Sequence, residues 1–394
     1  MLNLRDHLQA LRADQIQGKL DLGLILPACA LLALGVVMVA SSSIAVAEGD
    51  GLSPFYYLYR HLVFLALGLG LAGFLVIVPL EKIEQHHLWL LLGVFVLLAL
   101  PFVPGLGVRI NGARRWINLG VSNFQVVEMV KLMLIAYLAS YMVRLRPQLR
   151  STFGGILKPL GIAGLMMIAL LAQPDFGSAS LILAITLGMI WLGGAKPQYL
   201  AAMGATLLPV MVWAATSAEY RMRRLTSFLN PWKDPFDDGF QLTQALIAVG
   251  RGEWFGVGLG ASIQKLFYLP EAHTDFIFAV IAEELGLAGV ALVLALFAWM
   301  SARMFVLGMR GLRVGADFAA YCLFGIAIWL SVQAMVSIGV NLGVLPTKGL
   351  TLPLISSGGS SMLMTIAALG LALRAGFEIT RAERLAEIRP EVIA

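Results

Sequence analysis

Ionisable residues that interrupt long apolar stretches are the first candidates for chemistry in this sequence. Glu128 and Lys131 lie three residues apart in one such stretch, and Glu283 and Glu284 lie together in another. Residues three apart are neighbours on one helix face, so Glu128 and Lys131 are expected to pair. A charge at the centre of a membrane span costs about 2.5–3.5 kcal/mol on insertion scales, so each one needs a partner or a function. The pair either fixes helix packing or lines a polar cavity.

A third acidic group, Asp275, stands where the later stretch begins. At about 100° per residue it cannot share one helix face with both Glu283 and Glu284, which lie about 12 Å deeper by helical rise. Carboxylates are favoured in the first turn of a helix, so Asp275 either caps this helix or performs chemistry at its outer end. Glu283 and Glu284 are expected to pair with a basic group, and Lys131 is one candidate.

Basic residues gather in two segments that the charge pattern places outside the membrane. Arg109, Arg114 and Arg115 lie close together within 105–125, and a role in holding an anionic ligand would explain them. The segment 217–274 is also basic. Long loops are translocated across the membrane regardless of their charge. The basic residues of 217–274 therefore either bind a ligand or were simply tolerated during translocation.

A turn bounded by prolines carries the remaining basic candidate. Lys348 lies between Pro346 and Pro353, and a run of serines and glycines follows. Interrupted helix ends can present N–H groups to anions, whereas small residues can also serve close helix packing alone. The neighbouring lysine favours anion binding. The candidates in this run are Ser357, Gly358, Gly359 and Ser360.

The composition specifies the framework that must position these residues. Of the 394 residues, 59% are hydrophobic and 13% are charged, whereas soluble domains average about 45–50% and about 25%. Ten apolar stretches approach the length of about 20 residues that a bilayer requires. The sequence therefore predicts an all-α polytopic integral membrane protein with about ten transmembrane helices. The stretches are 21–47, 61–80, 87–104, 126–143, 156–172, 177–193, 197–216, 275–302, 318–345 and 352–373.

These stretches divide the chain into three parts. Residues 1–20 form an N-terminal segment, 21–373 a membrane domain and 374–394 a C-terminal tail. The side that holds both termini also carries most Lys and Arg residues, so both termini are expected in the cytoplasm. The segment 217–274 becomes a long extracytoplasmic loop between the seventh and eighth helices.

The long loop is expected to be folded. Residues 240–249 read as a short amphipathic helix that Gly250 ends. Gly256, Gly258 and Gly260 permit tight turns, and their spacing is no dinucleotide signature because no strand precedes them. No CxxC motif or Cys/His cluster is present in the sequence, so a zinc or redox site has little support.

Five strings of residues resemble the SEDS family, named for shape, elongation, division and sporulation. The resemblance covers nearly the whole chain, and 228–232 and 346–353 resemble its division members more than its elongation members. Val126-Val127 stands where the family usually has Pro-Ser, and Ser357 stands where it often has an aromatic residue. The strings are 111–117, 268–277, 283–286, 345–353 and 357–361.

The resemblance implies a ten-helix glycosyltransferase of the bacterial inner membrane that polymerises lipid II into peptidoglycan strands at the division septum. It also implies partners: the class B penicillin-binding protein FtsI and the FtsQ–FtsL–FtsB complex. The family's catalytic aspartate falls on Asp275, which favours a general base over a cap. Arg114, Arg115 and Lys348 become candidates for stabilising the pyrophosphate leaving group.

Two other functions remain open, with one question about a cofactor. A lipid II flippase could use the intramembrane charges as a polar path, although the arginines, Asp275 and Lys348 all lie on one side. A non-enzymatic divisome scaffold would not need Asp275. The sequence specifies no cofactor, and a divalent cation, Mg or Mn, could be bound only at a site shared with pyrophosphate.

Overall fold

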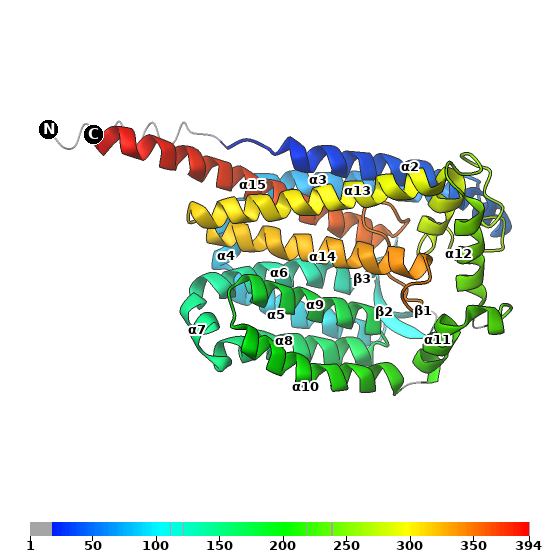
Figure 1. The fold of residues 1–394 in the computed structure, drawn as a ribbon, viewed down its shortest axis with the longest axis horizontal. Helices are drawn as coiled ribbons and strands as arrows, with labels where there is room; N and C mark the ends of the chain where they lie inside the picture. Colours follow the sequence, from blue (N-terminus) through cyan, green and yellow to red (C-terminus); the bar gives the residue numbers. More distant parts are fainter. Residues whose placement is uncertain (1–17, 111, 121, 218, 238, 394) are drawn as a thin grey trace.

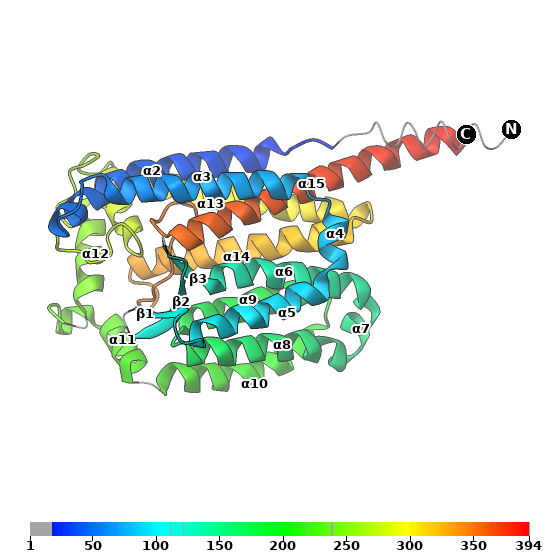
Figure 2. The same cartoon turned by 180° about the vertical axis from the view of Figure 1, so that it is seen from behind.

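The computed structural model is a bundle of roughly aligned helices, with a small sheet and a set of shorter helices at one end (Figure 1, Figure 2). It describes residues 18–393 except 111, 121, 218 and 238. Most of the predicted N-terminal segment 1–20 and residue Asn111 of the first string lie outside the described residues. The longer helices are α2 (Leu22–Gly49), α3 (Tyr56–Ile77), α5 (His87–Ala99), α6 (Val126–Arg144), α8 (Phe153–Ala172), α9 (Phe176–Leu192), α10 (Pro197–Thr216), α13 (Ile277–Arg313), α14 (Asp317–Asn341) and α15 (Gly359–Ile393).

Each of the ten predicted stretches falls mainly on one of these helices. Seven described helices are long and apolar enough to cross a membrane, and two shorter apolar helices, His87–Phe102 and Phe176–Leu192, match the third and sixth stretches. The helix α10 matches the seventh. The expected multi-pass helical membrane fold is therefore confirmed, while the number of spans stays a prediction. Along the chain, four short helices connect the longer ones. They are α4 (Leu80–Gln85), α7 (Arg146–Ser151), α11 (Glu219–Leu229) and α12 (Phe240–Arg251).

A three-stranded antiparallel sheet in 105–125 was not predicted. Its strands are β1 (Gly107–Ile110), β2 (Ala113–Asn118) and β3 (Asn123–Gln125), paired in the order β1-β2-β3. Gly112 lies between β1 and β2 with a φ of 79°, a left-handed conformation that glycine adopts without steric cost. The Asn-Gly dipeptide at 111–112 is a strong hairpin signal, and it could have revealed the sheet.

The helix α13 is interrupted at Gly286, where φ is 64° and ψ is −161°. Backbone groups freed by such a break need partners inside an apolar bundle. The segment 253–258 supplies them, so this part of the long loop completes the helix. The four backbone hydrogen bonds run from Val257 N to Glu283 O (2.9 Å), from Gly258 N to Glu284 O (3.1 Å), from Leu287 N to Glu253 O (2.9 Å) and from Ala288 N to Trp254 O (3.1 Å).

The short helix α12 confirms the amphipathic helix predicted at 240–249 but corrects its end. It continues through Gly250 to Arg251. Gly252 follows, and a Cβ on this residue would lie 1.8 Å from the carbonyl oxygen of Ala282 in α13. The helix therefore ends at Gly252, where close packing against α13 requires a residue without a side chain, and not at Gly250.

We expect Gly256→Ala to destabilise the protein more than Gly258→Ala. Both residues have left-handed φ values, 79° and 101°, so alanine costs about 1–2 kcal/mol at either. A Cβ on Gly256 would also lie 2.1 Å from the carbonyl oxygen of Glu284, whereas a Cβ on Gly258 meets nothing within 4 Å. Overpacking adds about 1–3 kcal/mol. Thermal unfolding in detergent measures the difference, and equal midpoints for the two variants would contradict this account of the helix break.

Candidate active site

A cavity of about 660 Å³ lies at the end of the bundle that carries the sheet. Its walls come from β2, the start of α9, the helix α11 and the turn after α14. These segments lie far apart in the sequence. Most of the charged residues that line the cavity are basic. The charged residues that line the cavity are Arg115, Asp175, Arg224 and Lys348.

Arg115 reaches the cavity because of its place on β2. Side chains alternate along a strand, and Ala113 and Arg115 line the cavity. The Nη2 atom of Arg115 donates to the carbonyl oxygen of Pro174 at 2.8 Å, and Nη1 lies 3.9 Å from Oδ1 of Asp175. These contacts orient the guanidinium and leave further donors for a ligand.

The other two predicted arginines do not line this cavity. Arg114 lies between Ala113 and Arg115 on β2, and it is paired with Arg109 of β1 in the sheet register. Both side chains are exposed. The Nε atom of Arg109 donates to the carbonyl oxygen of Gly112 at 3.1 Å. The three arginines that the sequence groups together are thus divided between two faces of the sheet.

Asp175 has a structural role that explains its burial. It is the N-cap of α9, and its carboxylate accepts hydrogen bonds from the backbone N–H and the hydroxyl of Ser178 at 3.1 and 2.8 Å. A capping carboxylate satisfies N–H groups that the first turn of a helix leaves free. Asp175 therefore fixes the start of α9 and the orientation of Arg115.

Lys348 enters the cavity from the turn that follows α14. Its Nζ atom lies 4.7 Å from the centroid of the Phe176 ring. Burial lowers the pKa of this lysine from its ordinary value. A phosphate group beside Lys348 would offset that desolvation because it favours the charged form of the amine.

Asp275 does not itself line the cavity but lies directly behind Gly349 of its wall, and we call this position the cavity edge. It does not cap α13. The helix begins at Ile277, and its N-cap is Phe276, which makes no side-chain cap, so the capping alternative is wrong. A Cβ on Gly349, a residue of the cavity wall, would lie 3.0 Å from Oδ2 of Asp275.

The pKa of the half-buried Asp275 carboxyl is well above its usual range. Burial, followed by the neighbouring Glu271 carboxylate, raises this pKa to about 7. The cationic groups of Arg224 and Arg115 act in the opposite direction. A carboxyl with this pKa is a stronger base than an exposed aspartate and is still substantially ionised at neutral pH.

The Ser/Gly run contacts neighbouring segments and does not line the cavity. The backbone N–H of Ser357 donates to the carbonyl oxygen of His273 at 3.0 Å. Ser360 accepts a hydrogen bond from the backbone N–H of Gln125 at 2.9 Å. Cβ atoms on Gly358 and Gly359 would lie 3.0 Å from Thr351 and 2.5 Å from Phe64, respectively. These contacts support the residues around the cavity.

The predicted ion pair between Glu128 and Lys131 is present in α6. Their Oε2 and Nζ atoms lie 2.8 Å apart, and both side chains are buried. Lys131 also donates to Oε1 of Gln333 at 2.9 Å, and Nε2 of Gln333 donates to the carbonyl oxygen of Thr351 at 3.0 Å. The pair therefore supports the segment that carries Lys348, from inside the bundle.

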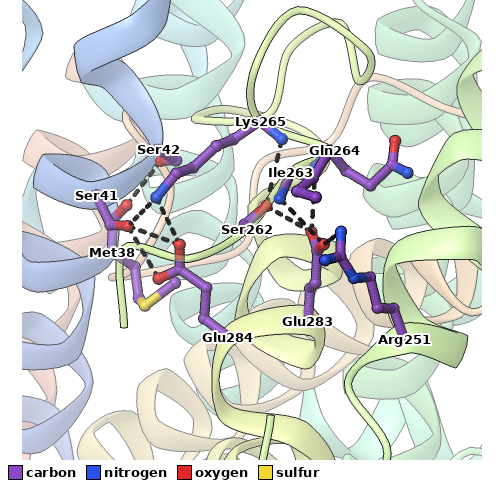
Figure 3. Close-up of polar contacts among 10 residues, drawn as sticks. All are labelled: Met38, Ser41, Ser42, Arg251, Ser262, Ile263, Gln264, Lys265, Glu283 and Glu284. Carbon is purple, nitrogen blue, oxygen red and sulfur yellow. Dashed lines mark hydrogen bonds and ion pairs between the residues drawn. The ribbon is translucent and has the colours of Figure 1, made fainter. Parts of the chain in front are cut away.

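Glu283 and Glu284 have basic partners as predicted, but neither partner is Lys131 (Figure 3). Glu284 pairs with Lys265 at 2.7 Å and accepts a hydrogen bond from Ser41 of α2. Glu283 pairs with Arg251 of α12 at 3.4 Å and accepts bonds from the segment 262–264. Both basic partners come from the long loop, so the two acids fasten this loop to the bundle.

Two cavity residues, Arg224 and Asp175, were not predicted from the sequence. Arg224 belongs to α11, within the basic loop 217–274 for which a ligand role had been left open. The sequence feature that pointed to Arg224 was the excess of basic residues in a loop expected on the outer side of the membrane. Asp175 follows a Gln-Pro dipeptide and precedes an apolar helix, a position where a capping carboxylate is expected.

A divalent cation at this site would depend on its ligand. In the part of the chain that the structure describes, no group of three or more His, Cys, Asp or Glu side chains could hold a metal. Both oxygens of Asp175 already accept hydrogen bonds. Asp275 alone does not make a cation site, so the oxygens of a bound pyrophosphate would have to supply most of the coordination.

Comparisons of sequence identify the chain's relatives. The chain is 55% identical over 377 residues to a protein of Xanthomonas oryzae named "Probable peptidoglycan glycosyltransferase FtsW", covering 96% of this chain and 77% of the relative. A protein of the same name from Thioalkalivibrio sulfidiphilus is 49% identical over 94% of this chain and 92% of the relative.

Two solved structures share the fold. One comes from work titled "Structural coordination of polymerization and crosslinking by a peptidoglycan synthase complex", with a TM-score of 0.72, 32% identity and coverage of 91% of this chain and 98% of that chain. The rod shape determining protein RodA of Thermus thermophilus aligns with a TM-score of 0.66, 31% identity and coverage of 91% and 96%. A family model described as "Cell cycle protein" matches residues 22–380, so this chain belongs to the FtsW, RodA and SpoVE family.

Proposed function

We propose that this chain is a peptidoglycan glycosyltransferase that polymerises lipid II, with Asp275 as the general base. The observation that carries the proposal is a carboxyl with a raised pKa at the edge of a cavity whose other walls carry Arg115, Arg224 and Lys348. Two relatives are named as probable peptidoglycan glycosyltransferases at 55% and 49% identity. A base beside a cationic cavity fits a reaction in which a hydroxyl attacks and a pyrophosphate leaves.

The step joins two lipid-linked sugars. The 4-hydroxyl of the incoming lipid II attacks C1 of the growing strand, the new C1–O bond forms, and the bond from C1 to the pyrophosphate oxygen breaks. Asp275 accepts the hydroxyl proton in the transition state, which typically accelerates such a step about 10²–10⁴-fold. The proton remains on Asp275, and undecaprenyl pyrophosphate leaves with the bonding electrons.

The cations of the cavity would stabilise the leaving group. Charge accumulates on pyrophosphate as the C1–O bond breaks, and charge-assisted hydrogen bonds strengthen accordingly. We assign this role to Arg115, Arg224 and Lys348. Arg109 and Arg114 do not line the cavity, so we do not assign this role to them. A divalent ion held by the pyrophosphate oxygens would supplement these cations.

The cellular setting forms part of the proposal. The chain would lie in the bacterial inner membrane at the division septum, with both termini in the cytoplasm. Its polymer needs crosslinking, so a class B penicillin-binding protein, FtsI, is the expected partner, together with FtsQ, FtsL and FtsB. The solved relative whose title couples polymerization with crosslinking supports the first of these partnerships.

Asp275→Asn should abolish polymerisation of purified lipid II because asparagine cannot accept the proton. We expect a loss of about 10²-fold or more with the transpeptidase partner present. The variant should still assemble with its partner and unfold at the wild-type temperature. Polymer formation by Asp275→Asn at the wild-type rate would overturn the base assignment. An inactive wild type in a properly assembled complex would favour the flippase or the scaffold.

The rate should fall as the pH drops through about 7. Asp275 must be ionised to accept a proton, and its pKa is raised to about 7, so kcat/KM should decrease tenfold per pH unit well below this value. Removing the cation of Arg224 should move the acidic limb to higher pH, since Arg224 lowers this pKa. A limb near the ordinary pKa of aspartate would contradict the raised value.

Arg224→Ala should lower kcat/KM about 10–100-fold if its guanidinium binds the pyrophosphate, because a hydrogen bond to a charged group contributes about 1.5–3 kcal/mol. The neighbouring Arg223→Ala is the matched control. Arg223 lies on the same helix and is exposed near Glu219, and it does not line the cavity. Equal losses in both variants would indicate a general effect of α11 and not a contact with the substrate.

A further inference from the structure

Three consecutive carbonyl groups next to the proposed base are held by hydrogen bonds from other segments. The backbone N–H of Ser357 donates to the carbonyl oxygen of His273 at 3.0 Å. The hydroxyl of Ser356 donates to the carbonyl oxygen of Thr274 at 2.7 Å. Nδ2 of Asn341 donates to the carbonyl oxygen of Asp275 at 3.0 Å. The backbone of the residue that carries the carboxylate is thus fixed from two sides.

Asn341 makes contacts on both sides of its amide group. Its Oδ1 accepts the backbone N–H of Ala279 at 2.9 Å, and its Nδ2 donates to Asp275 and also to Ser337, at 2.8 Å. The N–H of Ala279 belongs to the first turn of α13, where a capping side chain would normally accept it. The side chain of Phe276 supplies no such cap, and its carbonyl oxygen shares this N–H at 3.1 Å. Asn341, the last residue of α14, caps α13 across the helix interface and is fully buried.

Ser356 likewise uses its hydroxyl in both directions. It donates to Thr274 and accepts the backbone N–H of Leu352 at 2.8 Å. Leu352 belongs to the same turn as Lys348, and Gly349 of this turn lies against the carboxylate of Asp275. The contact through Ser356 therefore fixes the turn that carries a cavity cation relative to the turn that carries the base.

Backbone strain accompanies these contacts. Glu271, four residues before Asp275, has a φ of 56°, and Leu354, two residues before Ser356, has a φ of 65°. Residues other than glycine rarely adopt left-handed values, and they keep them only where the surroundings enforce them. Each of the two segments that these hydrogen bonds join thus contains one strained residue. This indicates that the surrounding structure holds both segments in one defined conformation.

We propose that Asn341 and Ser356 are positioning residues for the reaction: they hold the backbone of Thr274 and Asp275 so that the carboxylate stays at the cavity edge beside Gly349. The inference rests on the proposed function, because it presupposes that Asp275 is the base. It gives the Ser/Gly run a specific task, which is orientation of the base and not direct contact with an anion.

The test compares Asn341→Leu and Ser356→Ala with the wild type in polymerisation of purified lipid II by the complete complex. Leucine has the same branched heavy-atom skeleton as asparagine and removes all three hydrogen bonds of the Asn341 side chain. We expect each variant to reduce kcat by about 10²-fold, as a misplacement of about 1 Å can do. KM should stay unchanged in Asn341→Leu, because Asn341 makes no hydrogen bond to a residue of the cavity wall.

Ser331→Ala provides the matched control. The hydroxyl of Ser331 donates to Ser301 at 2.7 Å and joins the same two helices, α14 and α13, away from Asp275. This variant should keep the wild-type kcat. If Asn341→Leu does not fold, Ser356→Ala tests the same proposal, and Ser356→Thr should restore activity because it retains the hydroxyl.

The pH profile separates positioning from a general structural role. A released Asp275 gains solvent, so its pKa should fall and the acidic limb should move to lower pH. The charged groups that act on this carboxyl, Glu271, Arg224 and Arg115, are unchanged in both variants. Wild-type kcat and an unmoved limb in both variants, with Asp275→Asn inactive, would overturn the positioning proposal alone. Activity in Asp275→Asn would overturn the proposed base instead.

Discussion

A charge inside an apolar bundle is stable only beside a group that compensates it, and this constraint determines how the protein is held together. The three acids buried within the helices each have a basic partner, and two of these partners come from the long loop. Breaking such a pair leaves a charge without compensation and is costly. The loop that shapes the site is thus fixed by the same interactions that make the bundle's charges tolerable. The pairs are Glu128–Lys131, Glu283–Arg251 and Glu284–Lys265.

Asp275 departs from this pattern, and its proposed role as a base depends on that departure. Among the residues that the structure describes it forms no ion pair, and its pKa is raised to about 7. Its backbone, in contrast, is held by Asn341, and the preceding residue is held by Ser356. A residue fixed through its main chain keeps its side chain available for a substrate, whereas a carboxylate fixed by a cation would lose basicity.

The sequence was sufficient for features that depend on local pattern. Apolar stretches predicted the helices, and spacing by three residues predicted the Glu128–Lys131 pair, because both follow from the geometry of a single helix. Contacts between distant segments were not accessible in this way. The partners of Glu283 and Glu284 depend on how the loop folds back at Gly286, and the separation of Arg115 from Arg109 and Arg114 depends on a hairpin whose Asn-Gly signal was overlooked.

The electrostatics of the cavity link binding to catalysis. Three cations and one capped carboxylate, Asp175, line it, so it favours an anion. Arg115 and Arg224 lower the pKa of Asp275, and a bound pyrophosphate would partly neutralise them. The negative charge of the pyrophosphate would act in the same direction, so binding of a donor strand would raise the pKa of Asp275. In the proposed reaction, the carboxylate would therefore hold the hydroxyl proton more tightly while the leaving group is in place, and the departure of pyrophosphate would favour release of that proton before the next sugar is added.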